Sequence, residues 1–144
     1  MKVLIDLNVF IDYLQKRAPH YHHSAIVVSE ALKSNLTGVV PAHGVTTIYY
    51  VNSKHAGAAR ANENIDWLLA NFEIAPADKS AFTQARNSGF SDFEDAVVAS
   101  LAKASACDFI VTRNLPDFEN SPVPAITPEE FVRRYVSLEE NPPA

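Results

Sequence analysis

The sequence predicts an α/β fold: a three-layer α/β/α sandwich around a mainly parallel central sheet of four to five strands. Two observations support this prediction. Short apolar or β-branched runs alternate along the chain with longer stretches of helical periodicity. The runs are also continuous rather than alternating apolar and polar, which is typical of strands buried on both faces of a parallel sheet. Strands that alternate with helices favour such a sandwich.

The expected strands are short, apolar segments at residues 2–5, 37–41, 72–75, 109–111 and 123–126. Between them, helices are expected at residues 9–15, 23–34, 46–54, 58–71, 79–87 and 92–105. A last helix is expected at residues 128–135, because Thr127 suits the N-cap position, Pro128 suits the first turn, and Glu130 completes a capping box.

The 144 residues fit one domain with a substantial core, expected at residues 1–136. The polar, proline-ended tail at residues 137–144 is expected to be disordered. A single cysteine, Cys107, excludes an internal disulfide and suits a reducing cytoplasm, and no apolar run is long enough to predict a membrane span. The net charge of -5 does not indicate nucleic-acid binding, but a cluster of metal-binding carboxylates would lower that count.

One carboxylate stands at an unusual place in the first segment, MKVLIDLNVFIDYL. Asp6 directly follows the strand expected at residues 2–5, and ligands of open parallel sheets bind outside the carboxyl ends of the strands. Asp12 is expected on a different helical face from Asn8, where it would serve the surface or a structural salt bridge.

Two later segments carry similar polar residues. In SDFEDAVVASLAKA, Asp92 suits a helix N-cap, Asp95 begins an apolar face, and Glu94 points away from that face toward solvent. In FIVTRNLPDFE, the strand is followed by polar residues, as in the first segment; they are Thr112, Arg113, Asn114 and Asp117. Taken singly, Asn114 also fits a turn residue and Asp117 a solvated loop acid.

Carboxylate and amide oxygens of this kind select hard cations such as Mg²⁺ or Mn²⁺. The histidines at His20, His22 and His23 fit ordinary surface residues better than a metal site, because no cysteine or acid lies at ligand spacing. The sequence contains neither a nucleophile elbow nor a glycine-rich phosphate loop. A phosphoryl-transfer enzyme with Asp6 as nucleophile is disfavoured, since a second aspartate is expected where Asn8 stands.

Three segments in this order resemble the PIN domain family, as found in VapC-type toxins and related nucleases. They are LIDLNVFIDYL, DFEDAVVASLAKASACDFIVTRNLPDF and PVPAITPEEFV, and the resemblance spans roughly residues 2–133. It implies a parallel α/β/α sandwich and a Mg²⁺- or Mn²⁺-dependent ribonuclease. By position, it implies that the metal ligands are Asp6, Asp95 and Asp117.

The same resemblance implies that Asp92 is a further catalytic acid close to Asp95. It implies supporting roles for Asn8, which would orient Asp6, and for Asn114 beside Asp117. Arg113 would contact a backbone phosphate. Many members carry a glutamate near the position of Thr47, whereas this chain has no acid at residues 37–61. Either Asp92 supplies the missing charge or metal binding is weaker, and the Thr47 hydroxyl would reach only a metal-bound water.

Two functions follow as expectations. The first is a metal-dependent endoribonuclease in the cytoplasm, the toxin of a toxin–antitoxin pair, with an RNA substrate, an antitoxin partner and a homodimeric state. The second is a PIN-like module that has lost catalysis and binds RNA or a protein. Tyr49, Tyr50 and Val51 fit either the core or a dimer interface. The basic residues fit either an RNA groove or a solvated surface; they are Lys16, Arg17, Lys54, His55 and Arg60.

Overall fold

The computed structural model describes residues 1–136, so the tail predicted to be disordered lies outside the described residues. Five parallel strands form one sheet in the order β3-β2-β1-β4-β5. The predicted fold class is therefore confirmed. The strands are β1 (Lys2–Ile5), β2 (Thr37–Pro41), β3 (Glu73–Ala75), β4 (Phe109–Val111) and β5 (Ala125–Ile126).

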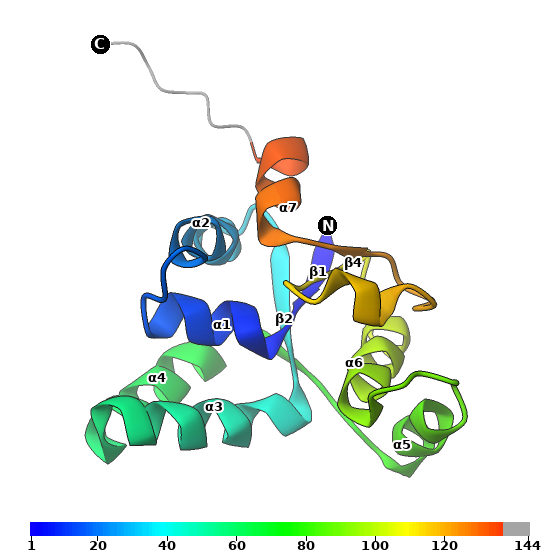
Figure 1. Ribbon diagram of the computed structural model, residues 1–144. Helices are drawn as coiled ribbons and strands as arrows, with labels where there is room; N and C mark the ends of the chain where they lie inside the picture. The colour runs from blue at the N-terminus through cyan, green and yellow to red at the C-terminus, as the bar shows by residue number, and fades with distance from the viewer. Residues whose placement is uncertain (137–144) are drawn as a thin grey trace.

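Helices cover both faces of the sheet (Figure 1). One apolar core joins the sheet to five helices, and a second core on the opposite face joins it to the remaining two. The first set is α1 (Leu7–Leu14), α2 (Tyr21–Leu32), α3 (Ala42–Ala56), α4 (Ala58–Asn71) and α7 (Pro128–Tyr135). The second set is α5 (Lys79–Arg86) and α6 (Phe93–Ala104), and a short 3-10 helix, η1, covers Leu115–Phe118.

The alternation of side chains along β1 divides the two cores. Val3 and Ile5 pack into the core beneath α1 and α2, whereas Leu4 packs against α6 on the other face. All three side chains are fully buried, because β1 lies at the centre of the sheet between β2 and β4. Central parallel strands are buried on both faces, which explains the continuous apolar run in the sequence.

Two helix starts and one short helix differ from the prediction for local reasons. Helix α1 begins at Leu7 because the side chain of Asp6 accepts a hydrogen bond from the Leu7 N–H and acts as the N-cap. Helix α3 begins at Ala42, directly after the extended residue Pro41. The helix η1 was not predicted, because a four-residue 3-10 turn has too little periodicity to be recognised.

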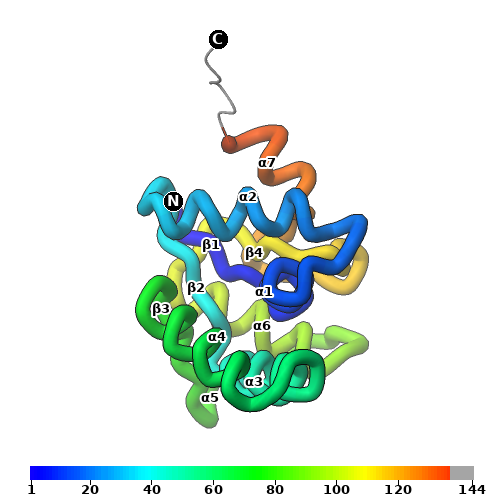
Figure 2. Tube along the Cα trace, turned by 90° about the vertical axis from the view of Figure 1, so that its left-hand side faces the viewer, coloured from blue at the N-terminus to red at the C-terminus, as the bar shows by residue number. Residues whose placement is uncertain are grey.

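The sheet reverses its direction of growth beside β1. The chain adds β2 and β3 on one side of β1 and then returns to add β4 and β5 on the other side. Figure 2 shows β1 and β4 side by side inside the molecule, with α1 at their end. In open α/β sheets, the crevice at such a switch point, outside the carboxyl ends of the strands, is the usual ligand site.

Candidate active site

Asp6 lies directly at this switch point, and both of its carboxylate oxygens are held. Oδ1 accepts a hydrogen bond from the Leu7 N–H at 2.8 Å, and Oδ2 accepts one from the Thr112 hydroxyl at 2.7 Å. The Asn8 amide donates a longer bond of 3.4 Å to Oδ2. Thr112 directly follows β4, so the two strand ends that flank the switch point are joined through this carboxylate.

Asp6 is only 3% exposed, and burial raises the pKa of its carboxyl group above the usual value. The hydrogen bond from Thr112 acts in the opposite direction, because it favours the charged form, and the nearby Glu94 carboxylate raises the pKa further. A cation placed beside such a buried carboxylate stabilises its charged form.

Asp95 is the second buried acid, at 6% exposure, in the first turn of α6. Burial raises its pKa to about 7, and the carboxylates of four neighbours add to the effect in the order Asp92, Asp6, Glu94 and Asp117. Asp6, which follows β1, and Asp117 in η1 are therefore near enough to raise the pKa of Asp95, although they are far from it in the sequence. Of the predicted acids, Asp92 and Asp95 lie in one cluster of carboxylates, with Glu94 as its third member. That Asp6 and Asp117 share a metal ion with them stays a prediction.

Asp92 caps α6, in agreement with the N-cap position that the sequence suggested. Its Oδ1 accepts a hydrogen bond from the Asp95 N–H at 2.9 Å. The capping bond leaves the other oxygen of this exposed carboxylate available to a ligand. Asp92, Glu94 and Asp95 each present a carboxylate oxygen, and these atoms lie within 4.8 Å of one another.

Glu94 is the residue that the sequence interpretation missed. Its side chain is about half exposed, but it does not simply point into solvent: its Oε2 lies 2.9 Å from Nε2 of His43 in the first turn of α3. The other ring nitrogen of His43 is buried and has no hydrogen-bond partner within residues 1–136. Since His43 and Glu94 are 51 residues apart, no local sequence signal links them.

Thr112 connects the first acid to the third polar segment. Its hydroxyl donates to Asp6 and accepts a hydrogen bond from the Asn114 N–H at 3.0 Å. Asn114 precedes η1, and Asp117 lies in the first turn of that helix, where both side chains are exposed. This loop therefore presents its polar side chains at the edge of the site, while Thr112 fixes its start.

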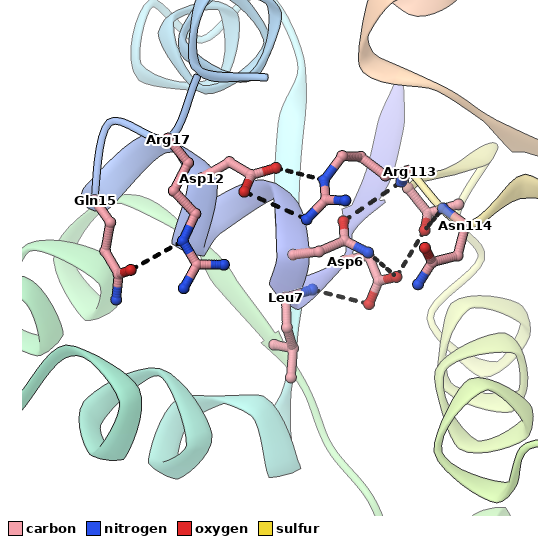
Figure 3. Close-up of polar contacts among 9 residues, drawn as sticks. Asp6, Leu7, Asp12, Gln15, Arg17, Arg113 and Asn114 are labelled. Atoms are coloured by element: carbon pink, nitrogen blue, oxygen red, sulfur yellow. Dashed lines mark hydrogen bonds and ion pairs between the residues drawn. The ribbon is translucent and has the colours of Figure 1, made fainter. Parts of the chain in front are cut away.

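Arg113 points away from the acids and toward α1 (Figure 3). Its Nε lies 2.6 Å from Oδ2 of Asp12, and its Nη2 lies 3.4 Å from Oδ1. Asp12 is fully buried, so a surface role for it was wrong and the alternative, a structural salt bridge, is what the fold contains. The phosphate contact of Arg113 stays a prediction, and Nη1 is the guanidinium nitrogen that Asp12 leaves available for it.

Thr47 lies on an exposed part of α3, and its hydroxyl bonds the His43 carbonyl of its own helix at 3.4 Å. Thr46 makes the same kind of bond. Neither residue supplies a charge. An acid does reach α3 from another helix: Glu94 of α6 contacts His43, which lies about one turn before Thr47.

The donor set fits a hard divalent cation. The atoms offered are carboxylate oxygens from Asp6, Asp92, Asp95 and, at the edge, Asp117, all of which are of the type that Mg²⁺ and Mn²⁺ prefer. The pKa of Asp95 is raised first by burial and then by negative charge on neighbouring carboxylates, and that charge calls for compensation. A bound cation would supply that compensation.

The family model described as the PIN domain matches residues 2–116, and the chain belongs to this family. A relative, Ribonuclease VapC1 of Aquifex aeolicus strain VF5, is 28% identical over 142 residues and is matched over 95% of this chain and 97% of its own length.

Solved structures share the fold. A chain of VapBC2 from Rickettsia felis, bound to a DNA fragment from its promoter, has a TM-score of 0.67 at 18% identity, with 88% of this chain and 98% of that chain covered. A chain of a toxin-antitoxin complex from Klebsiella pneumoniae has a TM-score of 0.65 at 18% identity, with coverage of 88% and 97%. No helix within residues 1–136 is long and apolar enough to cross a membrane.

Proposed function

We propose that this protein is a metal-dependent endoribonuclease that hydrolyses RNA phosphodiester bonds with Mg²⁺ or Mn²⁺. The observation that carries the proposal is the buried Asp6 carboxylate at the switch point of the sheet, together with the nearby cluster of Asp92, Glu94 and Asp95, whose carboxylate oxygens lie within 4.8 Å of one another. The relative named Ribonuclease VapC1, which matches over nearly the whole chain, supports RNA as the substrate.

In this proposal Asp6, Asp95 and Asp117 hold the cation, and Asp92 contributes a further carboxylate. When bound, the cation lowers the pKa of a coordinated water and stabilises charge on the scissile phosphate. Thr112 fixes the orientation of the Asp6 carboxylate through its 2.7 Å bond. Asn8 is placed to orient Asp6 and the following loop, because its amide donates to Asp6 and its oxygen accepts from the Arg113 N–H.

The absence of an acid at residues 37–61 favours one alternative, a PIN-like module that binds RNA or protein without cleaving. Glu94 weakens that alternative. It brings a carboxylate to the side of the site that faces α3, and His43 holds it there at 2.9 Å. We infer that Glu94 supplies the charge that α3 lacks.

We further propose that the protein is the toxin of a toxin–antitoxin pair, that it acts in the cytoplasm, and that it forms a homodimer. The similar chain from Klebsiella pneumoniae belongs to a toxin-antitoxin complex, which supports an antitoxin partner. The exposed Tyr50 on α3, with Lys54 lying over its ring at 4.9 Å, offers one aromatic surface for an interface between copies.

The central test is cleavage of labelled single-stranded RNA by the purified full chain with Mn²⁺, Mg²⁺ or EDTA. We expect cleavage with either metal, none with EDTA, and a loss of at least ~100-fold in Asp6→Asn. Thermal unfolding with and without Mn²⁺ separates the two functions. A chain that neither gains stability from Mn²⁺ nor cleaves RNA is a binding module instead.

A further inference from the structure

A pocket of about 500 Å³ opens near the carboxyl ends of β4 and β5. It lies between the start of α2, the residue after β4 and the start of α7. A cavity of this size is adequate for one nucleotide, since pockets for small ligands are commonly about 300–1,000 Å³. Its lining residues are Pro19, His20, His23, Arg113, Thr127, Pro128 and Glu129.

The backbone at Thr112 connects the pocket to the acidic site. Thr112, which donates a hydrogen bond to Asp6, also donates its N–H to the Ile126 carbonyl at 3.0 Å. The next residue along each strand, Arg113 after β4 and Thr127 after β5, lines the pocket. An RNA chain whose phosphate lies at Asp6 would therefore pass a neighbouring nucleotide over this opening.

Arg113 supplies the cationic side of the pocket in a fixed position. Two of its nitrogens are bound by Asp12, which is fully buried, and Nη1 makes no hydrogen bond to any residue of the described part. A guanidinium that is already oriented loses little conformational freedom when it binds a phosphate. The arrangement suits a flanking phosphate of single-stranded RNA.

The other walls suit a base. The half-buried rings of His20 and His23 and the two prolines, Pro19 and Pro128, give flat, apolar surfaces on which an unpaired base can stack. Glu129 adds two acceptor oxygens at the exposed side of α7. The Thr127 hydroxyl is already used, because it caps α7 by accepting from the Glu130 N–H at 3.1 Å.

A carboxylate such as that of Glu129 can distinguish between the four bases by the donors on their Watson–Crick edges. Guanine presents two adjacent donors, N1–H and the N2 amino group, and these match the two oxygens of a carboxylate. Adenine and cytosine present one amino donor beside a ring acceptor, and uracil presents one donor between two carbonyls. A carboxylate is repelled by each of those acceptors.

We propose that this pocket binds the nucleotide next to the cleaved phosphodiester and that it prefers guanine there, an inference that rests on the proposed ribonuclease function. Arg113 holds the flanking phosphate, His20 and His23 stack on the base, and Glu129 reads its Watson–Crick edge. A peptide segment is the less suitable occupant, because the pocket combines a cation, two imidazoles and a carboxylate within one small opening.

The test is fluorescence anisotropy with labelled uridine hexamers that carry one central guanine, one central inosine or uridine throughout. The chain is Asp6→Asn with Mg²⁺, so that binding is measured without cleavage, and the wild-type chain in EDTA repeats the series. We expect the guanine hexamer to bind ~10-fold tighter than the uridine hexamer, with inosine between them because it lacks the N2 amino group.

Variants locate the effect. Glu129→Gln should remove most of the guanine preference, and His20→Ala or His23→Ala should weaken every hexamer about five-fold or more. The controls are Leu69→Ala and Glu63→Gln, both exposed on α4 and neither lining the pocket. Both controls should bind as the unsubstituted chain does.

Two results overturn the inference: guanine preference that persists in Glu129→Gln, or RNA binding in His20→Ala and His23→Ala equal to that in Leu69→Ala. The second result would leave the pocket to a protein partner. A wild-type chain that does not cleave RNA, but binds the guanine hexamer through these residues, overturns the ribonuclease proposal and leaves the subsite standing. Cleavage at the wild-type rate in Glu129→Gln, His20→Ala and His23→Ala would support the ribonuclease proposal and overturn the proposed subsite.

Discussion

Arg113 and Asp12 join the end of β4 to the middle of α1 through two hydrogen bonds of one ion pair. The Asp12 carboxylate is fully buried and the Arg113 side chain is 30% exposed, so the pair is the principal charge contact between these elements in the described structure. The pair also fixes the loop that starts at Thr112, the residue whose hydroxyl donates a hydrogen bond to Asp6.

Replacing Asp12 by alanine should lower the free energy of unfolding by about 3–5 kcal/mol, because the arginine loses its partner while it remains largely buried. Urea unfolding monitored by circular dichroism measures this change. The control is Glu63→Ala, which breaks the exposed pair between Arg60 and Glu63 and should leave stability nearly unchanged. Equal effects of the two substitutions would mean that the buried pair contributes no more than a surface pair.

Replacing Thr112 by valine should reduce RNA cleavage by ~10- to 100-fold without unfolding the protein, because outer hydrogen bonds orient metal-binding carboxylates. The substitution keeps the shape of the side chain and removes the donor to Asp6 and the acceptor for the Asn114 N–H. The measurement is the single-turnover cleavage rate with Mn²⁺. Thr83→Val on α5 is the control, since that hydroxyl bonds only the Lys79 carbonyl in the same helix. A Thr112→Val rate equal to that of Thr83→Val would refute the orienting role.

The metal-free protein should become less stable as the pH rises from about 4 toward 8. The pKa of Asp95 is about 7 in the folded protein and near 3.8 in the unfolded chain, so between these values the folded state binds more protons. Stability then falls as protons are removed, and the contribution is fully present only below the unfolded pKa. Urea unfolding in EDTA at pH 5 and pH 8 measures the difference.

Asp95→Asn should make this pH dependence shallower, whereas Asp66→Asn on the exposed side of α4 should leave it unchanged. Mn²⁺ should restore stability more at pH 8 than at pH 5, because the cation competes with the proton for the same oxygens. A pH profile that is identical in wild type and Asp95→Asn would show that Asp95 titrates normally.

Replacing Glu94 by glutamine should weaken Mn²⁺ binding about five- to ten-fold, since a carboxylate is lost from a cluster whose oxygens lie within 4.8 Å. Replacing His43 by alanine should have a smaller effect in the same direction, because it frees Glu94 without removing its charge. Isothermal titration with Mn²⁺ measures both, and Glu63→Gln is the control for a lost surface carboxylate. Unchanged affinity in Glu94→Gln would exclude it as the substitute for the missing acid of α3.

Local sequence signals predicted most of the fold. The bounds of β1, β2 and β4 and of α4 and α7 agree with the predicted ones, because apolar runs, the Thr127–Pro128 cap and turn residues act within a few positions. Strand β5 is shorter than expected, at two residues, because only Ala125 and Ile126 pair with β4 at the edge of the sheet.

The site was predictable where a residue's place depends on its own strand or helix, as for Asp6 after β1 and Asp95 in the first turn of α6. It was not predictable where two distant elements meet. The burial of Asp12 depends on Arg113, about a hundred residues later, and the position of Glu94 depends on His43 in α3. No periodicity or spacing within one segment contains that information.

The parallel pairing of β1 with β4 also sets the time at which the protein becomes active during its synthesis. Asp6 leaves the ribosome before its partner Thr112, which is made 106 residues later. One edge of β1 therefore stays unpaired until β4 has been translated. A nascent chain cannot assemble the acidic site before Thr112 has been made. The site therefore forms only after the chain through β4 has emerged and folded.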